Sequence, residues 1–183
     1  MKKALIIIDY VNDFVATDGK LTCGEPAQAI DHCIADMVTA FSRHEDFIVV
    51  ASDCHGENDS YNPEHKLFPA HCIRGTSGSE LYGETREAVR EANPSLLIPV
   101  DKIRYSAFAG TNLDIKLRER QVTHLYLVGV CSDICVLHTA IDAYNLGYQI
   151  SIVENGVASF NAEGHSFALA HCKNTLGAEI MAV

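Results

Sequence analysis

Four groups of reactive side chains stand at or just after the ends of short apolar runs in this sequence. In chain order they are Asp9, Asp53 with His55, Lys102, and Cys135. Short apolar runs of β-prone residues are typical of strands buried on both faces. Because the carboxyl ends of parallel strands meet at one edge of an open sheet, we expect these side chains to converge there, although they lie far apart in the chain.

Asp9, Lys102 and Cys135 would together make a nucleophilic group. A thiolate is the reactive form of cysteine, and a neighbouring carboxylate can accept the thiol proton and pass it to a leaving amine. The ammonium of Lys102 would stabilise both anions and bias Cys135 toward the thiolate. Backbone N–H groups at Cys131 and Cys135 could receive a developing oxyanion, so the set suits attack on an amide carbonyl. Taken singly, Cys135 could instead be a small buried hydrophobe and Lys102 a solvated surface charge.

Cys135 stands at the junction of an expected strand and an expected helix. Residues 125–130 are apolar and β-prone, and residues 136–144 place apolar side chains at helical spacing. Ser132 and Asp133, which lie between the two, are residue types that favour the N-cap of a helix. We therefore expect Cys135 in the first turn of the helix, where N–H groups and the positive end of the dipole favour an anion.

A second set of side chains carries the oxygen and nitrogen ligands of a metal site. Its members are Asp53, His55, Glu64, His65 and His71. Side chains two positions apart on an extended segment point the same way, so Asp53 and His55 could bind one ion, and a distant histidine could complete the site. Zinc, manganese and iron all accept such ligands, and the ligand types do not choose among them. The alternative is a set of solvated side chains in the long polar loop 56–79, although loops of this length are usually functional.

Strands and helices are expected to alternate along the chain. We expect strands at 4–8, 47–51, 96–100, 125–130, 150–153 and 179–182, a loop over 10–26, and helices from Pro26 to about His44 and at 80–92, 112–120, 136–144 and 163–172. Such alternation predicts parallel βαβ units. The expected fold class is therefore α/β, a three-layer, doubly wound, Rossmann-like domain with a mostly parallel six-stranded sheet and helices on both faces, spanning residues 1–183 as one unit.

Composition limits the partners and the compartment. A chain of 183 residues is large enough for one substantial core, and its net charge of −10 argues against a nucleic-acid partner. Seven irregularly spaced cysteines fit free thiols in a reducing cytoplasm better than a disulfide framework. The start MKKALIII predicts a first strand rather than a signal peptide, and no apolar stretch is long enough to span a membrane. We expect a cytoplasmic protein.

Five motifs give the chain a family resemblance over nearly its whole length. They are IIIDYVNDF at the start, SDCH at 52–55, FPAHCIRGTSG at 68–78, DKIRYSAFAGTNLD at 101–114 and GVCSDICVLHTAIDA at 129–143. In this order they resemble the nicotinamidases among the isochorismatase-like cysteine hydrolases. The sequence departs from that pattern at Val11, Phe68 and Cys131, where glutamine, tryptophan and threonine or a small aliphatic residue are common in relatives.

The resemblance implies roles for both sets of side chains. It implies that Asp9, Lys102 and Cys135 form a catalytic triad. It also implies a divalent metal ion held by Asp53, His55 and His71, with Glu64 as a further ligand, either directly or through water. The ion would hold the pyridine nitrogen of the substrate.

The resemblance further implies a ring pocket beside the triad. Phe14, Phe68 and Tyr105 would line it, together with Val130 and Cys131. The peptide bond between Val130 and Cys131 would be cis, which would aim the backbone N–H donors of Cys131 and Cys135 at the oxyanion.

The expected reaction is hydrolysis of nicotinamide to nicotinate and ammonia through a thioester, as part of NAD salvage. Pyrazinamide is a second candidate substrate, and a homo-oligomer is expected. Cys135 and the metal set argue against the vinyl ether cleavage of isochorismatases themselves. Three alternatives stay open: a related enzyme for carbamoyl or ureido substrates, a non-catalytic metal-binding protein on the same fold, and a thiol redox sensor that uses Cys131 and Cys135.

Overall fold

Six parallel strands form a central sheet in the computed structural model, which describes residues 2–183. The strands are β1 (Lys2–Ile8), β2 (Phe47–Asp53), β3 (Leu97–Lys102), β4 (Val122–Val130), β5 (Gln149–Ala158) and β6 (Glu179–Met181). Their order is β3-β2-β1-β4-β5-β6, and each neighbouring pair is parallel. The sheet is thus doubly wound, as expected, and it is parallel throughout rather than mostly parallel.

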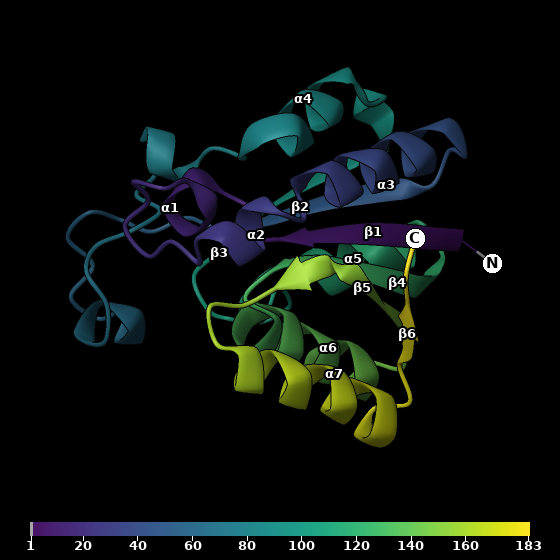
Figure 1. The fold of residues 1–183 in the computed structure, drawn as a ribbon. Helices are drawn as coiled ribbons and strands as arrows, with labels where there is room; N and C mark the ends of the chain where they lie inside the picture. The colour runs from purple at the N-terminus through teal and green to yellow at the C-terminus, as the bar shows by residue number, and fades with distance from the viewer. Residues whose placement is uncertain (1) are drawn as a thin grey trace.

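Helices cover both faces of this sheet (Figure 1). They are α1 (Asn12–Val15), α2 (Glu25–Gln28), α3 (Asp31–Arg43), α4 (Gly83–Glu91), α5 (Leu113–Glu119), α6 (Leu137–Asn145) and α7 (Ala162–Thr175). Helices α3 and α4 lie on one face, while α5, α6 and α7 lie on the other. The expected three-layer fold class is therefore confirmed. Within residues 2–183, no helix combines the length and the apolar composition that crossing a bilayer requires.

The strand β1 contributes to the cores on both sides of the sheet. Leu5 and Ile7 face the layer that contains Ile34 of α3, whereas Ile6 faces the layer that contains Leu113 of α5. All of these side chains are completely buried. A strand in this position needs apolar residues on both faces, which explains its unbroken apolar run.

Element boundaries differ from expectation in several places. The helix expected from Pro26 to His44 is two helices, α2 and α3, and the expected loop 10–26 contains the short helix α1. Strand β5 continues to Ala158, beyond the expected end at 153, because its pairing with β4 shifts register between Leu127 and Gly129. Short 3-10 helices at Pro63–Lys66, Ser77–Ser79 and Pro94–Leu96 were also not expected.

Gly129 brings the carboxyl ends of β1 and β4 together. Its φ of +113° is unfavourable for residues with a side chain, and a Cβ atom there would fall against the carbonyl oxygen of Ile8. The close approach is followed at once by Val130 and Cys131, whose peptide bond is cis, as expected. The carboxyl ends of the central strands lie on the left in Figure 1, on the same side as α1.

Candidate active site

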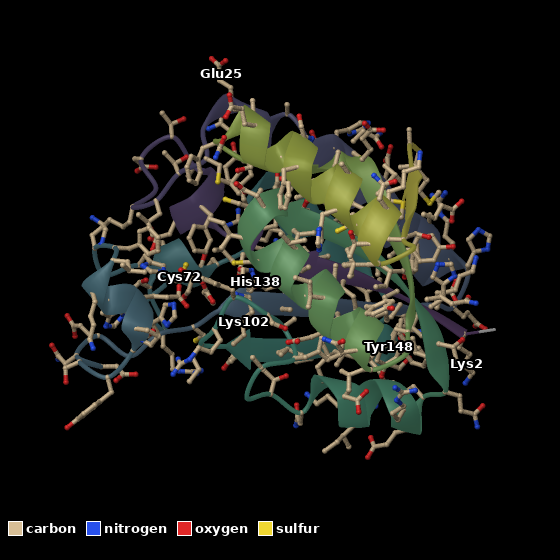
Figure 2. The ribbon with its side chains drawn as sticks, turned by 90° about the horizontal axis from the view of Figure 1, so that it is seen from below. Lys2, Glu25, Cys72, Lys102, His138 and Tyr148 are labelled. Carbon is tan, nitrogen blue, oxygen red and sulfur yellow. The ribbon has the colours of Figure 1, made fainter. Side chains whose placement is uncertain are left out.

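Lys102 is the centre of a buried charged cluster at the carboxyl edge of the sheet. Its Nζ lies 2.6 Å from Asp9 Oδ2 and 2.6 Å from Asp53 Oδ1, and its side chain is completely buried. The pairing of β2 with β3 sets Asp53 directly opposite Lys102. Figure 2 shows Lys102 in the same region as Cys72 and His138, away from Lys2 at the start of the chain. Buried charges are costly unless they are paired, and such clusters gather at functional sites.

Asp9 presents its carboxylate to this cluster through an unusual backbone conformation. Its φ is 53°, in the left-handed region that few non-glycine residues adopt. The Asp9 N–H donates to Ala51 O at 2.9 Å, and Asp9 Oδ1 accepts the Asp53 N–H at 2.7 Å. Strain of this kind persists where the surrounding structure enforces it, which is most often at active sites.

Cys135 lies in a π-helical turn, Ser132–Val136, that leads into α6. The Val136 N–H donates to Cys131 O at 3.2 Å, and Cys135 borders the same cavity as Asp9. Such turns are rare and often functional. The position of Cys135 at the start of the helix agrees with expectation.

The N-cap expected at Ser132 and Asp133 is wrong. Cys131 precedes the turn, and no side chain caps it. Ser132 Oγ instead lies 2.9 Å from Nδ1 of His165 on α7. The hydroxyl expected to cap the helix therefore makes a contact with another helix. Asp133 Oδ1 is buried without a hydrogen-bond partner among the described residues.

The surroundings of Cys135 favour a thiol rather than the expected thiolate. Burial raises the pKa of Cys135 well above its usual value, and the negative charges of Asp9 and Asp53 raise it further, against the effect of Lys102. Burial and the charge of Asp53 also raise the pKa of Asp9 to about 7. The expected bias toward a thiolate is therefore wrong, because burial outweighs the nearby ammonium. These shifts favour a proton on Cys135 and give Asp9 a carboxyl group that ionises near neutral pH.

Lys102 keeps its positive charge within this cluster. Burial alone would lower the pKa of Lys102, but the charges of Asp9 and Asp53 and the hydrogen bond to Asp53 raise it well above its usual value. The pKa of Asp53 is lowered in turn, because the attraction of Lys102, the hydrogen bond that Lys102 donates and the nearby ring of His55 together overcome the effect of burial. The ammonium therefore holds two carboxylates in one place.

Four buried side chains next to this cluster have the geometry of a metal site. Asp53, His55, Glu64 and His71 each offer one ligand atom, and these atoms lie within 4.8 Å of one another. Asp53 Oδ2, His55 Nε2, Glu64 Oε1 and His71 Nε2 are buried, and none has a hydrogen-bond partner among the described residues. Unpaired buried polar atoms are costly, so a convergent set of them fits a divalent ion. His65, which the sequence grouped with these ligands, is not part of the set.

Contacts behind the two histidines orient their rings. Pro69 O accepts a hydrogen bond from Nδ1 of His71 at 2.8 Å, which leaves Nε2 with a free lone pair. The side-chain amide of Asn62 lies 2.8 Å from Nδ1 of His55. Both rings therefore direct Nε2 toward the carboxylates, and Nε2 is a common metal-binding atom of histidine.

Asp13 holds the loop that carries His71, a role that the sequence did not indicate. Its Oδ2 accepts the Cys72 N–H at 2.7 Å, and its Oδ1 accepts the Lys20 N–H at 3.3 Å. Cys72 has a φ of 47°, so its backbone is held in the left-handed region. Asp13 is part of the IIIDYVNDF motif, but nothing in its spacing points to a partner fifty-nine positions away.

A largely apolar cavity of ≈ 260 Å³ opens between the two sets of side chains. Asp9, Cys135, Asp53, Glu64 and His71 border it, and so do all five expected pocket residues, Phe14, Phe68, Tyr105, Val130 and Cys131. Lys102 and His55 do not line it and lie behind its wall. The sequence missed Leu21, Thr22, Ile134 and Phe160, which also border the cavity. They come from loops and from the π-helical turn, where apolar periodicity carries no signal.

The sequence and the fold have counterparts among known proteins. The sequence model of the Isochorismatase domain matches residues 3–183. The isochorismatase family protein PncA of Bacillus subtilis (strain 168) is 54% identical over 182 residues, or 98% of this chain and 99% of that protein. The crystal structure of nicotinamidase/pyrazinamidase PncA from Bacillus subtilis has a TM-score of 0.97 at 53% identity and covers 100% of both chains. The pyrazinamidase of Pyrococcus horikoshii in complex with zinc has a TM-score of 0.85 at 26% identity, again over 100% of both chains.

Proposed function

The chain belongs to the isochorismatase family, and on this basis we propose that it is a metal-dependent cysteine amidohydrolase that converts nicotinamide to nicotinate and ammonia. The observation that carries the proposal is the convergence of three side chains: Cys135 and Asp9 border the same cavity, and Lys102 Nζ lies 2.6 Å from Asp9 Oδ2 behind its wall. A buried thiol beside a carboxylate that ionises near neutral pH has both the nucleophile and the base that amide hydrolysis requires. The similarity to a nicotinamidase/pyrazinamidase over the whole chain supports the choice of substrate.

In the proposed reaction, Asp9 accepts the proton of Cys135 while the sulfur attacks the carboxamide carbon. Backbone N–H groups of Cys131 and Cys135 receive the negative charge that develops on the carbonyl oxygen. Asp9 then returns the proton to the leaving nitrogen, so ammonia departs and a thioester remains on Cys135. A water molecule that gives a proton to Asp9 attacks the thioester, the C–S bond breaks and nicotinate is released, and Asp9 returns the proton to the sulfur of Cys135. Lys102 keeps Asp9 in position throughout.

The cavity walls suit a flat aromatic ring. Phe14, Phe68 and Tyr105 supply aromatic faces, and the Phe14 ring centroid lies 5.5 Å from that of His71. Pyrazinamide has the same carboxamide on a ring of similar size, and we include it as a second substrate. Linear carbamoyl and ureido substrates would leave much of this aromatic surface without a partner.

Asp53, His55 and His71 would hold a divalent ion, with Glu64 as a direct or water-mediated ligand. Zinc is our first choice, since the pyrazinamidase of Pyrococcus horikoshii is in complex with zinc. When bound, the ion supplies a positive charge that can hold the pyridine nitrogen of the substrate. Nicotinate is a precursor of pyridine nucleotides, so we assign the reaction to NAD salvage.

The test is ammonia release from nicotinamide by the metal-loaded protein. The Cys135→Ala variant should lose the activity, and Cys172→Ala, which removes a buried thiol from α7, should keep it. Activity that survives in Cys135→Ala would contradict the proposal. No ammonia from the metal-loaded wild type would also contradict it, and carbamoyl and ureido compounds would then be the next substrates to assay.

A further inference from the structure

Two cysteines outside the proposed catalytic group meet in the wall of the cavity. The Sγ atoms of Cys23 and Cys131 lie 2.9 Å apart, although the residues are separated by 108 positions in the chain. Both side chains are buried, with 4% of Cys23 and 9% of Cys131 exposed. Cys131 borders the cavity, whereas Cys23 lies behind it. The proposed reaction uses neither thiol.

We propose that Cys23 and Cys131 form an oxidisable dithiol, which hydrogen peroxide converts to an intramolecular disulfide in the cavity wall. The two sulfurs already lie within about 1 Å of the length of a disulfide bond. The sequence alone suggested Cys131 and Cys135 as a redox pair. The structure gives Cys131 a different partner, because its sulfur meets that of Cys23, whereas Cys135 borders the cavity together with Asp9.

Cys23 differs chemically from the other cysteines. Its pKa is lowered chiefly by the hydrogen bond with the Cys131 thiol, against the effect of burial. Among residues 2–183, each of the other cysteines has a raised pKa, with burial as the first or second cause. A thiol of lowered pKa in contact with a second thiol favours oxidation to a disulfide, because the thiolate is the form that oxidants attack.

The cavity gives a small oxidant a route to the pair. Cys131 borders it, and Phe160, which is 64% exposed, stands at its rim. The deprotonated sulfur of the pair attacks one oxygen of peroxide, which breaks the O–O bond and gives a sulfenic acid and hydroxide. Hydroxide takes up a proton to become water. The second thiol then attacks the sulfenic sulfur, the S–S bond forms, and the hydroxyl group leaves with the thiol proton as a second water.

The bond would join two parts of the cavity wall. Cys23 follows Leu21 and Thr22, which border the cavity, and Cys131 immediately precedes the π-helical turn that contains Cys135. A covalent link here would fix the loop against the strand that carries the proposed oxyanion donor. We therefore expect a several-fold, reversible loss of turnover on oxidation, a consequence that rests on the proposed function.

The test uses the metal-loaded wild type, Cys23→Ser and, as a matched buried thiol, Cys172→Ser, each treated with a stoichiometric amount of hydrogen peroxide. We expect the wild type and Cys172→Ser to lose the mass of two hydrogen atoms. Peptide mapping without reduction should join the Cys23 and Cys131 peptides, and dithiothreitol should restore the mass. Cys23→Ser should form no such disulfide. The map of the wild type decides the question even if a variant folds poorly.

Three results would overturn the proposal: an unchanged content of free thiols, a Cys131–Cys135 disulfide, or oxygen added to Cys135 alone. Ammonia release, measured on the same samples, should fall in the wild type and return with dithiothreitol, whereas Cys23→Ser should keep a larger share of its activity. Should nicotinamide prove not to be a substrate, the mass and the peptide map would still decide whether the dithiol exists. Failure of the proposed function and failure of this inference are thus told apart.

Discussion

Asp53 and Lys102 are paired residues of β2 and β3, and their side chains meet at 2.6 Å. The second carboxylate oxygen of Asp53 points to the metal-type cluster and lies 3.6 Å from His55 Nε2. One carboxylate therefore contacts both the ammonium that holds Asp9 and the atoms that would bind an ion. A substitution of Lys102 should therefore alter the metal-type cluster, and a substitution in that cluster should alter the position of Lys102.

Replacement of Lys102 should affect stability as well as activity. In Lys102→Met the buried carboxylates of Asp9 and Asp53 lose their counter-charge, and breaking a buried pair in this way costs about 3–5 kcal/mol of unfolding free energy. Urea denaturation measures the loss. The exposed Lys173→Met is the control and should change stability by less than about 0.5 kcal/mol. A Lys102→Met protein as stable as the wild type would show that the ammonium does not stabilise the cluster.

The pH dependence of turnover should report the ionisation of Asp9. Asp9 must be a carboxylate to accept the thiol proton, and burial together with the charge of Asp53 raises its pKa to about 7. The value of kcat/KM should therefore fall as pH decreases through about 7. A pH–rate profile, with circular dichroism to show that the protein stays folded, measures it. A full rate retained down to the ordinary pKa of an aspartate would contradict the assignment.

Removal of the metal should lower thermal stability and activity together. An ion that binds only the folded state stabilises it by about 2.7 kcal/mol when its concentration is a hundred times Kd, so a chelator should lower Tm and added zinc should restore it. His71→Ala should retain less metal after dialysis, as measured by elemental analysis. The exposed His44→Ala is the control and should retain the metal content of the wild type. Equal metal content in His71→Ala and wild type would exclude the predicted site.

Asp13 should support the metal site without touching the ion. In Asp13→Ala the buried Cys72 N–H loses its acceptor, which costs about 1–3 kcal/mol, and the neighbouring His71 loses its support. We expect lower stability in urea and weaker zinc binding by calorimetry. The exposed Asp18→Ala should resemble the wild type in both measurements. If Asp13→Ala loses stability but binds zinc normally, Asp13 is a structural residue only.

Much of the fold followed from local patterns. The apolar run at residues 4–8 identified a strand buried on both faces, and the alternation of elements identified the parallel sheet. Because parallel strands end at one edge, the sequence could also bring Asp9, Lys102 and Cys135 to the same place. Their catalytic roles remain predictions that the variants above would test.

The features that the sequence did not predict depend on contacts between segments that are distant in the chain. Ser132 pairs with His165 rather than capping its helix, and Cys23 meets Cys131 from a loop with no periodic pattern. The protonation of Cys135 was predicted wrongly for a related reason. The charge of Lys102 can be anticipated from the sequence, but the complete burial that opposes its effect exists only in the folded protein.

Because glycine has no side chain, Gly129 limits which substitutions this sequence can accept. The separation of β1 and β4 at their carboxyl ends depends on the absence of one carbon atom, since a Cβ would meet the carbonyl oxygen of Ile8. Even alanine would push the segment after Asp9 away from the segment that leads to Cys135. In a library of all single substitutions, position 129 should therefore tolerate as little change as the nucleophile itself, although it has no reactive group.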